Sequence, residues 1–99
     1  MKKHVLSDKQ FHAISKALAD PRRFAIFQQI AQEKALACCA LTEHEVISPA
    51  TISHHLKELS EAGLIEIEHE GRTANLELRP EVWKAYVDRL ASICAAKQT

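Results

Sequence analysis

Several features that would assign the chain to a specialised class are missing from its 99 residues. No apolar run approaches the roughly 18 residues that a membrane-spanning helix requires, and the N-terminus lacks the hydrophobic segment of a signal peptide. We therefore expect a cytoplasmic protein that does not enter a membrane. The three cysteines are an odd number in a chain without a secretion signal, which argues against a disulfide framework. No repeat, low-complexity stretch or linker divides residues 1–99, so we expect a single domain.

The chain also has no net charge, because 13 Lys and Arg residues balance 13 Asp and Glu residues. Zero net charge by itself argues against nucleic-acid binding. The charges are unevenly spread, however. Residues 1–34 carry seven basic and three acidic side chains, whereas residues 48–75 carry two basic and five acidic ones. A DNA-binding role must accommodate that acidic segment, so the nonspecific part of any DNA affinity is expected to be modest.

Catalytic signatures are absent as well. Cys38 or Cys39 with a histidine is a conceivable nucleophilic pair, but no catalytic motif surrounds the two cysteines. We therefore expect no enzyme.

Apolar residues at helical spacing, preceded by Ser or Asp caps and by proline, predict five helices. These span residues 8–18, 21–33, a short stretch around 41–47, residues 49–62 and residues 81–95. Two alternating segments, 64–68 and 74–78, flank the turn at Gly71 and predict a β-hairpin. The predicted order is α-α-α-α-β-β-α, a mainly α fold with a β-hairpin wing, which is typical of a winged helix-turn-helix.

The predicted helix 49–62 has two different faces. Ile52, Leu56 and Leu59 fall on one side of it. Small and polar side chains fall on the other, namely Ala50, Ser53, His54 and Lys57. Such side chains can approach base edges without a steric barrier, as a recognition helix requires. An ordinary amphipathic helix with a solvated polar face explains the same pattern, so both interpretations are open at this point.

Longer stretches of sequence resemble a known family. Residues 18–24 (LADPRRF) resemble the "L-A-D-P-x-R" opening of the second helix of ArsR/SmtB-type repressors. Residues 48–59 (SPATISHHLKEL) and 62–65 (AGLI) resemble the recognition segment of that family, and residues 70–72 resemble its wing tip. The matches span most of residues 7–90. The resemblance implies a homodimeric repressor that binds a palindromic operator on double-stranded DNA and is released by an inducer.

The resemblance also implies roles for individual residues. Those expected in or beside the major groove are Ser48, Ala50, Thr51, Ser53, His54 and Lys57. Arg72 is expected to reach the flanking minor groove or a phosphate. His55 lies on the apolar stripe and is interpreted as a packing residue. For Arg22 and Arg23, a solvated first turn, an ion pair and a phosphate contact are all open.

The last helix carries more apolar residues than a surface helix of a small monomer needs. We therefore expect the terminal helices to form the interface of a homodimer, although a purely intramolecular core is an alternative. The expected interface residues are Phe11, Ile14, Trp83, Tyr86, Val87, Leu90 and Ile93.

The inducer is not evident from the sequence. Metal-sensing members of the family carry a C-x-C motif at which this chain has Ala37, Cys38 and Cys39, so the motif is broken. Three hypotheses remain open for Cys38, Cys39 and Cys94: a thiol-bound metalloid or metal ion, a redox or persulfide switch, and simple packing of small apolar side chains. Metal binding through His4, His12 or His44 is a further alternative, and no cofactor is assigned.

A different class of function is also open. The acidic segment 58–70 favours a winged-helix module that binds proteins and not DNA.

Overall fold

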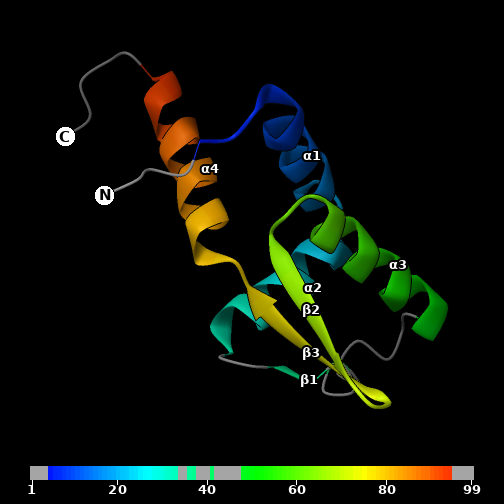
Figure 1. Ribbon diagram of the computed structural model, residues 1–99. Helices are drawn as coiled ribbons and strands as arrows, with labels where there is room; N and C mark the ends of the chain where they lie inside the picture. Colours follow the sequence, from blue (N-terminus) through cyan, green and yellow to red (C-terminus); the bar gives the residue numbers. More distant parts are fainter. Residues whose placement is uncertain (1–4, 34–35, 38–40, 42–47, 95–99) are drawn as a thin grey trace.

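Capping side chains and proline residues set where the helices of the chain begin. The computed structural model describes residues 5–33, 36–37, 41 and 48–94 (Figure 1). The helices in that part are α1 (Asp8–Leu18), α2 (Pro21–Gln32), α3 (Pro49–Glu61) and α4 (Pro80–Ile93). The strands are β1 (Leu36–Ala37), β2 (Ile65–Glu70) and β3 (Thr73–Leu78). The four predicted helices that fall within the described residues are confirmed, with ends that differ by no more than two residues.

The N-termini of α1, α2 and α3 are capped as the sequence predicts. The Ser7 hydroxyl accepts a hydrogen bond from the backbone N–H of Gln10, and the Ser48 hydroxyl accepts one from that of Thr51. At α2 the Asp20 carboxylate accepts from two backbone N–H groups. Each such cap is generally worth about 1 kcal/mol to a helix. The capping signals in the sequence are therefore physical start points of these three helices.

Strand β1 is a feature that the sequence does not predict, because two residues show no alternation. It pairs with β3 through Leu36 and Leu76, which gives an antiparallel sheet in the order β1-β3-β2. The predicted short helix around 41–47 falls, apart from Leu41, outside the described residues. Leu41 itself is buried in the core.

The hairpin β2–β3 separates apolar and acidic side chains onto its two faces. Ile65 pairs with Leu78, and Ile67 pairs with Leu76, so these four lie on the same face of the hairpin. The opposite face carries the acidic side chains, which are Glu66, Glu68, Glu70 and Glu77, all of them exposed. The hairpin turns at Gly71, whose φ of 63° favours glycine.

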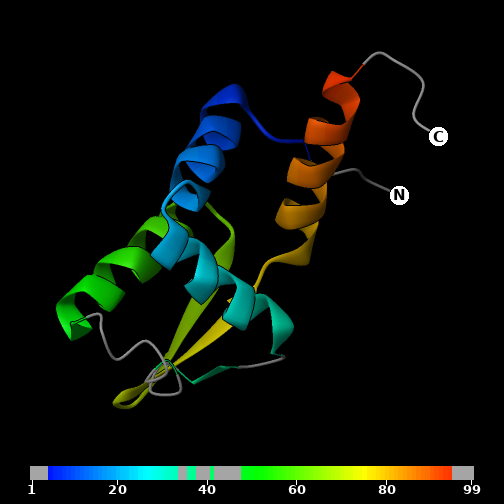
Figure 2. The ribbon, with the colours of Figure 1, turned by 180° about the vertical axis from the view of Figure 1, so that it is seen from behind.

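The core lies between the sheet and the helices. Figures 1 and 2 show α2 crossing one face of the hairpin, with α1 and α3 packed beside it. The side chains with no exposed surface come from every layer, and include Ile14, Ile26, Ile30, Leu59, Leu64, Leu76 and Val82. This shared core sets the position of α3 relative to the hairpin.

Helix α4 joins the rest of the chain through aromatic and charged side chains. Trp83 lies 5.2 Å from Phe27 of α2, and Tyr86 lies 5.2 Å from Phe11 of α1, both measured between ring centroids. The Tyr86 hydroxyl is also 2.9 Å from the Ser15 hydroxyl of α1. Arg89 pairs with Asp8 at 2.6 Å and lies over the Phe11 ring. These contacts hold α4 against α1.

The glycine that ends α3 has less room for a side chain than the glycine at the hairpin turn. Gly63 has a φ of 86° and closes α3, with its N–H and that of Leu64 bonded to carbonyls of the last turn. A Cβ at Gly63 would lie 2.5 Å from the side-chain nitrogen of Gln10, which donates to the Ala62 carbonyl, whereas a Cβ at Gly71 would meet nothing.

We expect Gly71→Ala to lower the free energy of unfolding by about 1 kcal/mol, because of the positive φ alone. Gly63→Ala should cost roughly 1 kcal/mol more, because it also displaces Gln10 from its hydrogen bond. Urea unfolding followed by circular dichroism measures both, and equal losses in the two variants would contradict the prediction.

Candidate nucleic-acid interface

Helix α3 buries one side and exposes the other, as the sequence predicts. His55, Leu56 and Leu59 are buried, at 5%, 6% and 0% exposure. Four of the residues expected to meet DNA, Ala50, Ser53, His54 and Lys57, are exposed on the opposite side. Ser48 and Thr51 lie at the N-terminal end of the helix, where Ser48 is exposed and Thr51 is half-buried. We name these six residues together the α3 polar face.

Members of the α3 polar face differ in how their polar groups are engaged. The Ser48 hydroxyl caps the helix and lies 2.9 Å from the Thr51 hydroxyl, so these two groups already have partners within the protein. The side chains of Ser53 and His54 make no hydrogen bond in the part of the chain that the structure describes. Their donors and acceptors are therefore available to base edges, which makes them the strongest candidates for sequence recognition.

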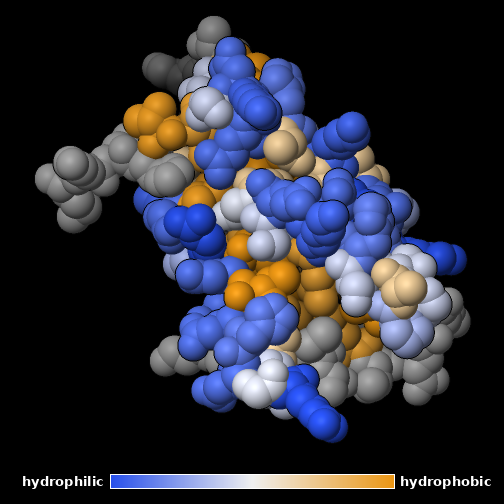
Figure 3. Space-filling view, turned by 45° about the vertical axis from the view of Figure 1, so that its right-hand side comes forward, coloured by the Kyte–Doolittle hydropathy of each residue, from blue (hydrophilic) through white to orange (hydrophobic). Residues whose placement is uncertain are grey.

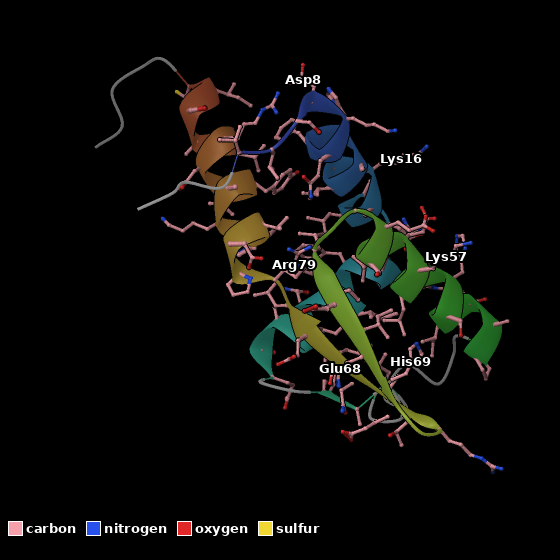
Figure 4. All side chains as sticks on the ribbon, viewed as in Figure 1. Asp8, Lys16, Lys57, Glu68, His69 and Arg79 are labelled. Carbon is pink, nitrogen blue, oxygen red and sulfur yellow. The ribbon has the colours of Figure 1, made fainter. Side chains whose placement is uncertain are left out.

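The hairpin supplies a second element beside α3. Arg72 lies at its turn and is exposed. Figure 4 shows Glu68 and His69 along β2, and it shows Lys16 of α1 and Lys57 of α3 pointing out of the same side of the molecule. An exposed arginine at a hairpin tip is suited to a phosphate or a narrow minor groove. The acidic face of the hairpin would be repelled by DNA.

The interpretation of His55 as a packing residue agrees with its burial, but the sequence did not reveal its partner. The Nε of Arg23 donates to Nδ1 of His55 at 3.1 Å, which links α2 to α3. Burial lowers the pKa of His55 below its usual value of 6.5, and the positive charge of Arg23 lowers it further. The ring is therefore neutral near pH 7.

Arg23 makes contacts that none of the sequence-based interpretations named. It is half-buried, and its guanidinium bonds to His55 and to the Ala17 carbonyl, so it neither sits in a solvated turn nor points outward to a phosphate. No spacing signal could have shown this, because Arg23 and His55 are 32 residues apart. Arg22, in contrast, is exposed.

The Asp20 carboxylate, which caps α2 beside Arg23, has a lowered pKa. Hydrogen bonds from the backbone N–H groups of Arg23 and Arg22 lower the pKa of Asp20. Asp20 therefore stays ionised to lower pH than a free aspartate does, and α2 keeps its N-terminal cap over that range.

The residues expected at a dimer interface divide into two groups. Ile14 and Tyr86 are buried within the chain's own core, at 0% and 7% exposure, so they have little or no surface to offer a partner. Phe11 and Trp83 are half-buried against the core. Val87, Leu90 and Ile93 are exposed at 41%, 43% and 69%. Figure 3 shows hydrophobic atoms reaching the surface on the side of the molecule where α4 lies.

The cysteines expected to act as sensors are only partly described. Cys38 and Cys39 lie outside the described residues. Cys94 follows the last residue of α4 and is exposed, so of the three open hypotheses, packing inside the chain's own core does not apply to it. Among residues 5–33, 36–37, 41 and 48–94, no group of His, Cys, Asp and Glu side chains is arranged to hold a metal ion.

The longest helix in the described part of the chain, α4, has 14 residues, which is too short to span a bilayer.

Comparisons with known proteins place this arrangement in a family. Residues 18–68 match the model of a helix-turn-helix domain. The chain is 37% identical over 83 residues to YceK, an uncharacterised HTH-type transcriptional regulator of Bacillus subtilis, with 82% of this chain and 83% of that protein covered. It is 38% identical over 69 residues to the arsenic resistance transcriptional regulator ArsR1 of Pseudomonas putida. That match covers 70% of this chain and 54% of the relative.

Solved structures share the fold. An ArsR-like transcriptional regulator from Rhodococcus sp. RHA1 is similar with a TM-score of 0.74 and 21% identity, over 86% of this chain and 79% of that one. The homodimeric winged helix-turn-helix DNA-binding domain Mb0332 of Mycobacterium bovis, a possible ArsR-family regulator, gives a TM-score of 0.67 and 25% identity. The match covers 97% of this chain and 96% of that domain. With a capped α3 exposing its polar face beside a hairpin wing, the chain belongs to the ArsR family of winged helix-turn-helix, DNA-binding transcriptional regulators.

Proposed function

We propose that the chain acts in the cytoplasm as a homodimeric repressor that binds a palindromic operator through α3 and the hairpin. The observation that carries this proposal is the α3 polar face, where Ser53 and His54 have unengaged polar groups, together with the exposed Arg72 at the turn of the hairpin. The side chains on the N-terminal half of a recognition helix are the ones that contact base edges in the major groove. Lys57, further along the same face, is placed to contact a phosphate.

The charge distribution determines how the hairpin approaches DNA. Its acidic face carries Glu66, Glu68, Glu70 and Glu77 and must point away from the phosphates. Arg72 is the cationic side chain at the tip of the hairpin, so the wing contributes about one phosphate contact for each protomer. The sequence preference therefore arises from α3, and Arg72 adds affinity that is independent of sequence.

A second copy of the chain is the partner that best fits α4. Val87, Leu90 and Ile93 follow one another at intervals of three residues, which places them on one exposed stripe of the helix. The similarity to the homodimeric Mb0332 domain supports a homodimer. To enter successive major grooves, the two copies of α3 in the dimer must lie about 34 Å apart. Because a twofold axis relates the two copies, the operator they bind is proposed to be palindromic.

The inducer and the role of the thiols stay predictions. Cys94 is exposed at the end of α4, close in sequence to the apolar stripe, and Cys38 and Cys39 fall outside the described residues. A metalloid or metal ion would change the affinity for DNA only if it bound the free and the DNA-bound protein with different affinity. Oxidation of a thiol would likewise change that affinity only if it stabilised one of the two forms more than the other.

Selection of duplexes from a randomised library by the purified protein tests the proposal. We expect enrichment of an inverted repeat whose half-sites are one helical turn apart. Enrichment of no sequence, together with weak binding that shows no dependence on salt, would support the protein-binding module instead, because a protein that contacts phosphates loses affinity as salt rises.

Substitutions should separate base recognition from phosphate contact. We expect Ser53→Ala and His54→Ala to reduce the preference for the selected duplex over a scrambled one by about 1–3 kcal/mol each, as for a lost base contact. Arg72→Ala should weaken binding to both duplexes alike and lower the salt slope by about one. Fluorescence titrations at several salt concentrations measure both effects. Wild-type behaviour of all three variants would show that the interface is assigned to the wrong surface.

The dimer is tested by charge on the exposed stripe. Leu90→Glu should convert the assembly from a dimer to the 11.1 kDa monomer at micromolar concentration, because an ionised carboxylate is costly to bury without a partner. Phe24→Glu is the matched control, since Phe24 is exposed to a similar extent, 37%, but lies on α2. Sedimentation equilibrium reads the mass, and a wild-type protein that sediments as a monomer would refute the homodimer.

A further inference from the structure

The contact between Arg23 and His55 lies directly behind the residues proposed to read DNA. His55 follows Ser53 and His54 in α3, and its ring points to the buried side of the helix. The other buried side chains of α3 are apolar, and apolar packing does not by itself prevent a helix from rotating slightly about its axis. The hydrogen bond from Arg23 is directional and joins α3 to α2 at this level of the helix.

Arg23 is itself held from two sides. The Asp20 carboxylate accepts hydrogen bonds from the backbone N–H groups of Arg22 and Arg23, which fixes the first turn of α2. The guanidinium also donates to the Ala17 carbonyl in the last turn of α1, at 3.4 Å. The Arg23 side chain therefore connects α1, α2 and α3, and His55 is the point at which this connection reaches the recognition helix.

The direction of the hydrogen bond sets the protonation state of His55. Because Nδ1 accepts from Arg23, the ring is neutral and carries its proton on Nε2. Nε2 is buried and has no hydrogen-bond partner within the described part of the chain. Protonation at Nδ1 would remove the acceptor and place a second positive charge 3.1 Å from Arg23.

We propose that Arg23 is a positioning residue for DNA recognition, which acts through its hydrogen bond to neutral His55 to hold Ser53 and His54 at the base edges. This inference rests on the proposed interface. It adds that operator preference depends on a buried contact that touches no DNA, and that the contact is lost when His55 becomes protonated.

The surroundings of His55 determine the direction of the pH dependence. Burial is the main factor that disfavours the charged ring, followed by Arg23. Asp20 favours the charged ring, and His54 and Arg22 disfavour it more weakly. The titratable side chains of α1 and β2, which also contact α3, are exposed; they are Asp8, Lys9, His12, Lys16, Glu66, Glu68, His69 and Glu70. The contact is therefore intact at pH 7.5 and is lost as the pH falls below 6.5 toward the lowered pKa of His55.

The first arm of the test compares two neighbouring arginines. Arg23→Met keeps the apolar stem and removes the donor, and Arg22→Met removes the same charge from an exposed position that makes no hydrogen bond to His55 among the described residues. We expect Arg23→Met to reduce the preference for the library-selected duplex over a scrambled one by about tenfold, the effect of a lost charged hydrogen bond. Arg22→Met should weaken binding to both duplexes equally. Circular dichroism confirms that each variant is folded.

The second arm uses pH. His55→Asn places an amide oxygen near the position of Nδ1, so it can accept from Arg23 but cannot be protonated. Between pH 7.5 and about pH 5.5, the preference of the wild type should fall by up to about tenfold in total, the loss expected for Arg23→Met, because protonation of His55 removes the same hydrogen bond. The preference of His55→Asn should stay flatter, because the two proteins differ only at residue 55 and the asparagine side chain takes up no proton in this range.

The outcomes separate this inference from the function on which it rests. A wild-type protein that shows no preference for the selected duplex at pH 7.5 refutes the proposed function and, with it, this inference. A wild type with clear preference, in which Arg23→Met behaves like Arg22→Met or His55→Asn keeps the full pH dependence, overturns the positioning role alone. If Arg23→Met fails to fold, the comparison of His55→Asn with the wild type decides.

Discussion

The burial of one side of α3 is the constraint on which the surface of this protein depends. Leu56 and Leu59 enter a core that α1, α2 and the sheet share, so the opposite side of the helix must face outward. Ser53 and His54 are exposed for that reason, and not because of any contact of their own. A helix that lost this anchoring would present a different set of side chains to DNA, even if it stayed helical.

Polar contacts refine what apolar packing achieves. The core places α3 beside the hairpin, but the directional bond between Arg23 and His55 is what ties its rotation to α2. A buried histidine lowers the free energy of unfolding, because one ring nitrogen has no partner among the described residues. Leucine at the same position would leave no polar atom unpaired. The orientation of α3 is thus specified here with some loss of stability, as is proposed for buried polar groups in other proteins.

The segregation of charge reconciles a net charge of zero with DNA binding. The acidic residues of β2 and β3 share one face of the hairpin, while Lys57 and Arg72 lie on α3 and at the hairpin turn. Because β-strands alternate their side chains between two faces, these acids can be turned away from the phosphates without disturbing the apolar face. Overall charge is therefore a poor guide to function for a domain of this kind.

Local chemistry in the sequence determined where elements start and stop. Ser7, Asp20 and Ser48 cap their helices through hydrogen bonds to residues two or three positions later, and Gly63 ends α3 because glycine tolerates a positive φ. Periodicity likewise showed which side of α3 is buried, including His55.

Long-range contacts could not be read in this way. Strand β1 exists because Leu36 pairs with a residue 40 positions later, and the sequence did not reveal the contact of Arg23 because its partner is 32 residues away. The same holds for Ile14 and Tyr86, whose side chains suit a core and an interface equally until the packing of the elements against one another buries them. Spacing within one element reports its own faces, whereas the identity of the surface that covers each face is decided only when the elements pack together.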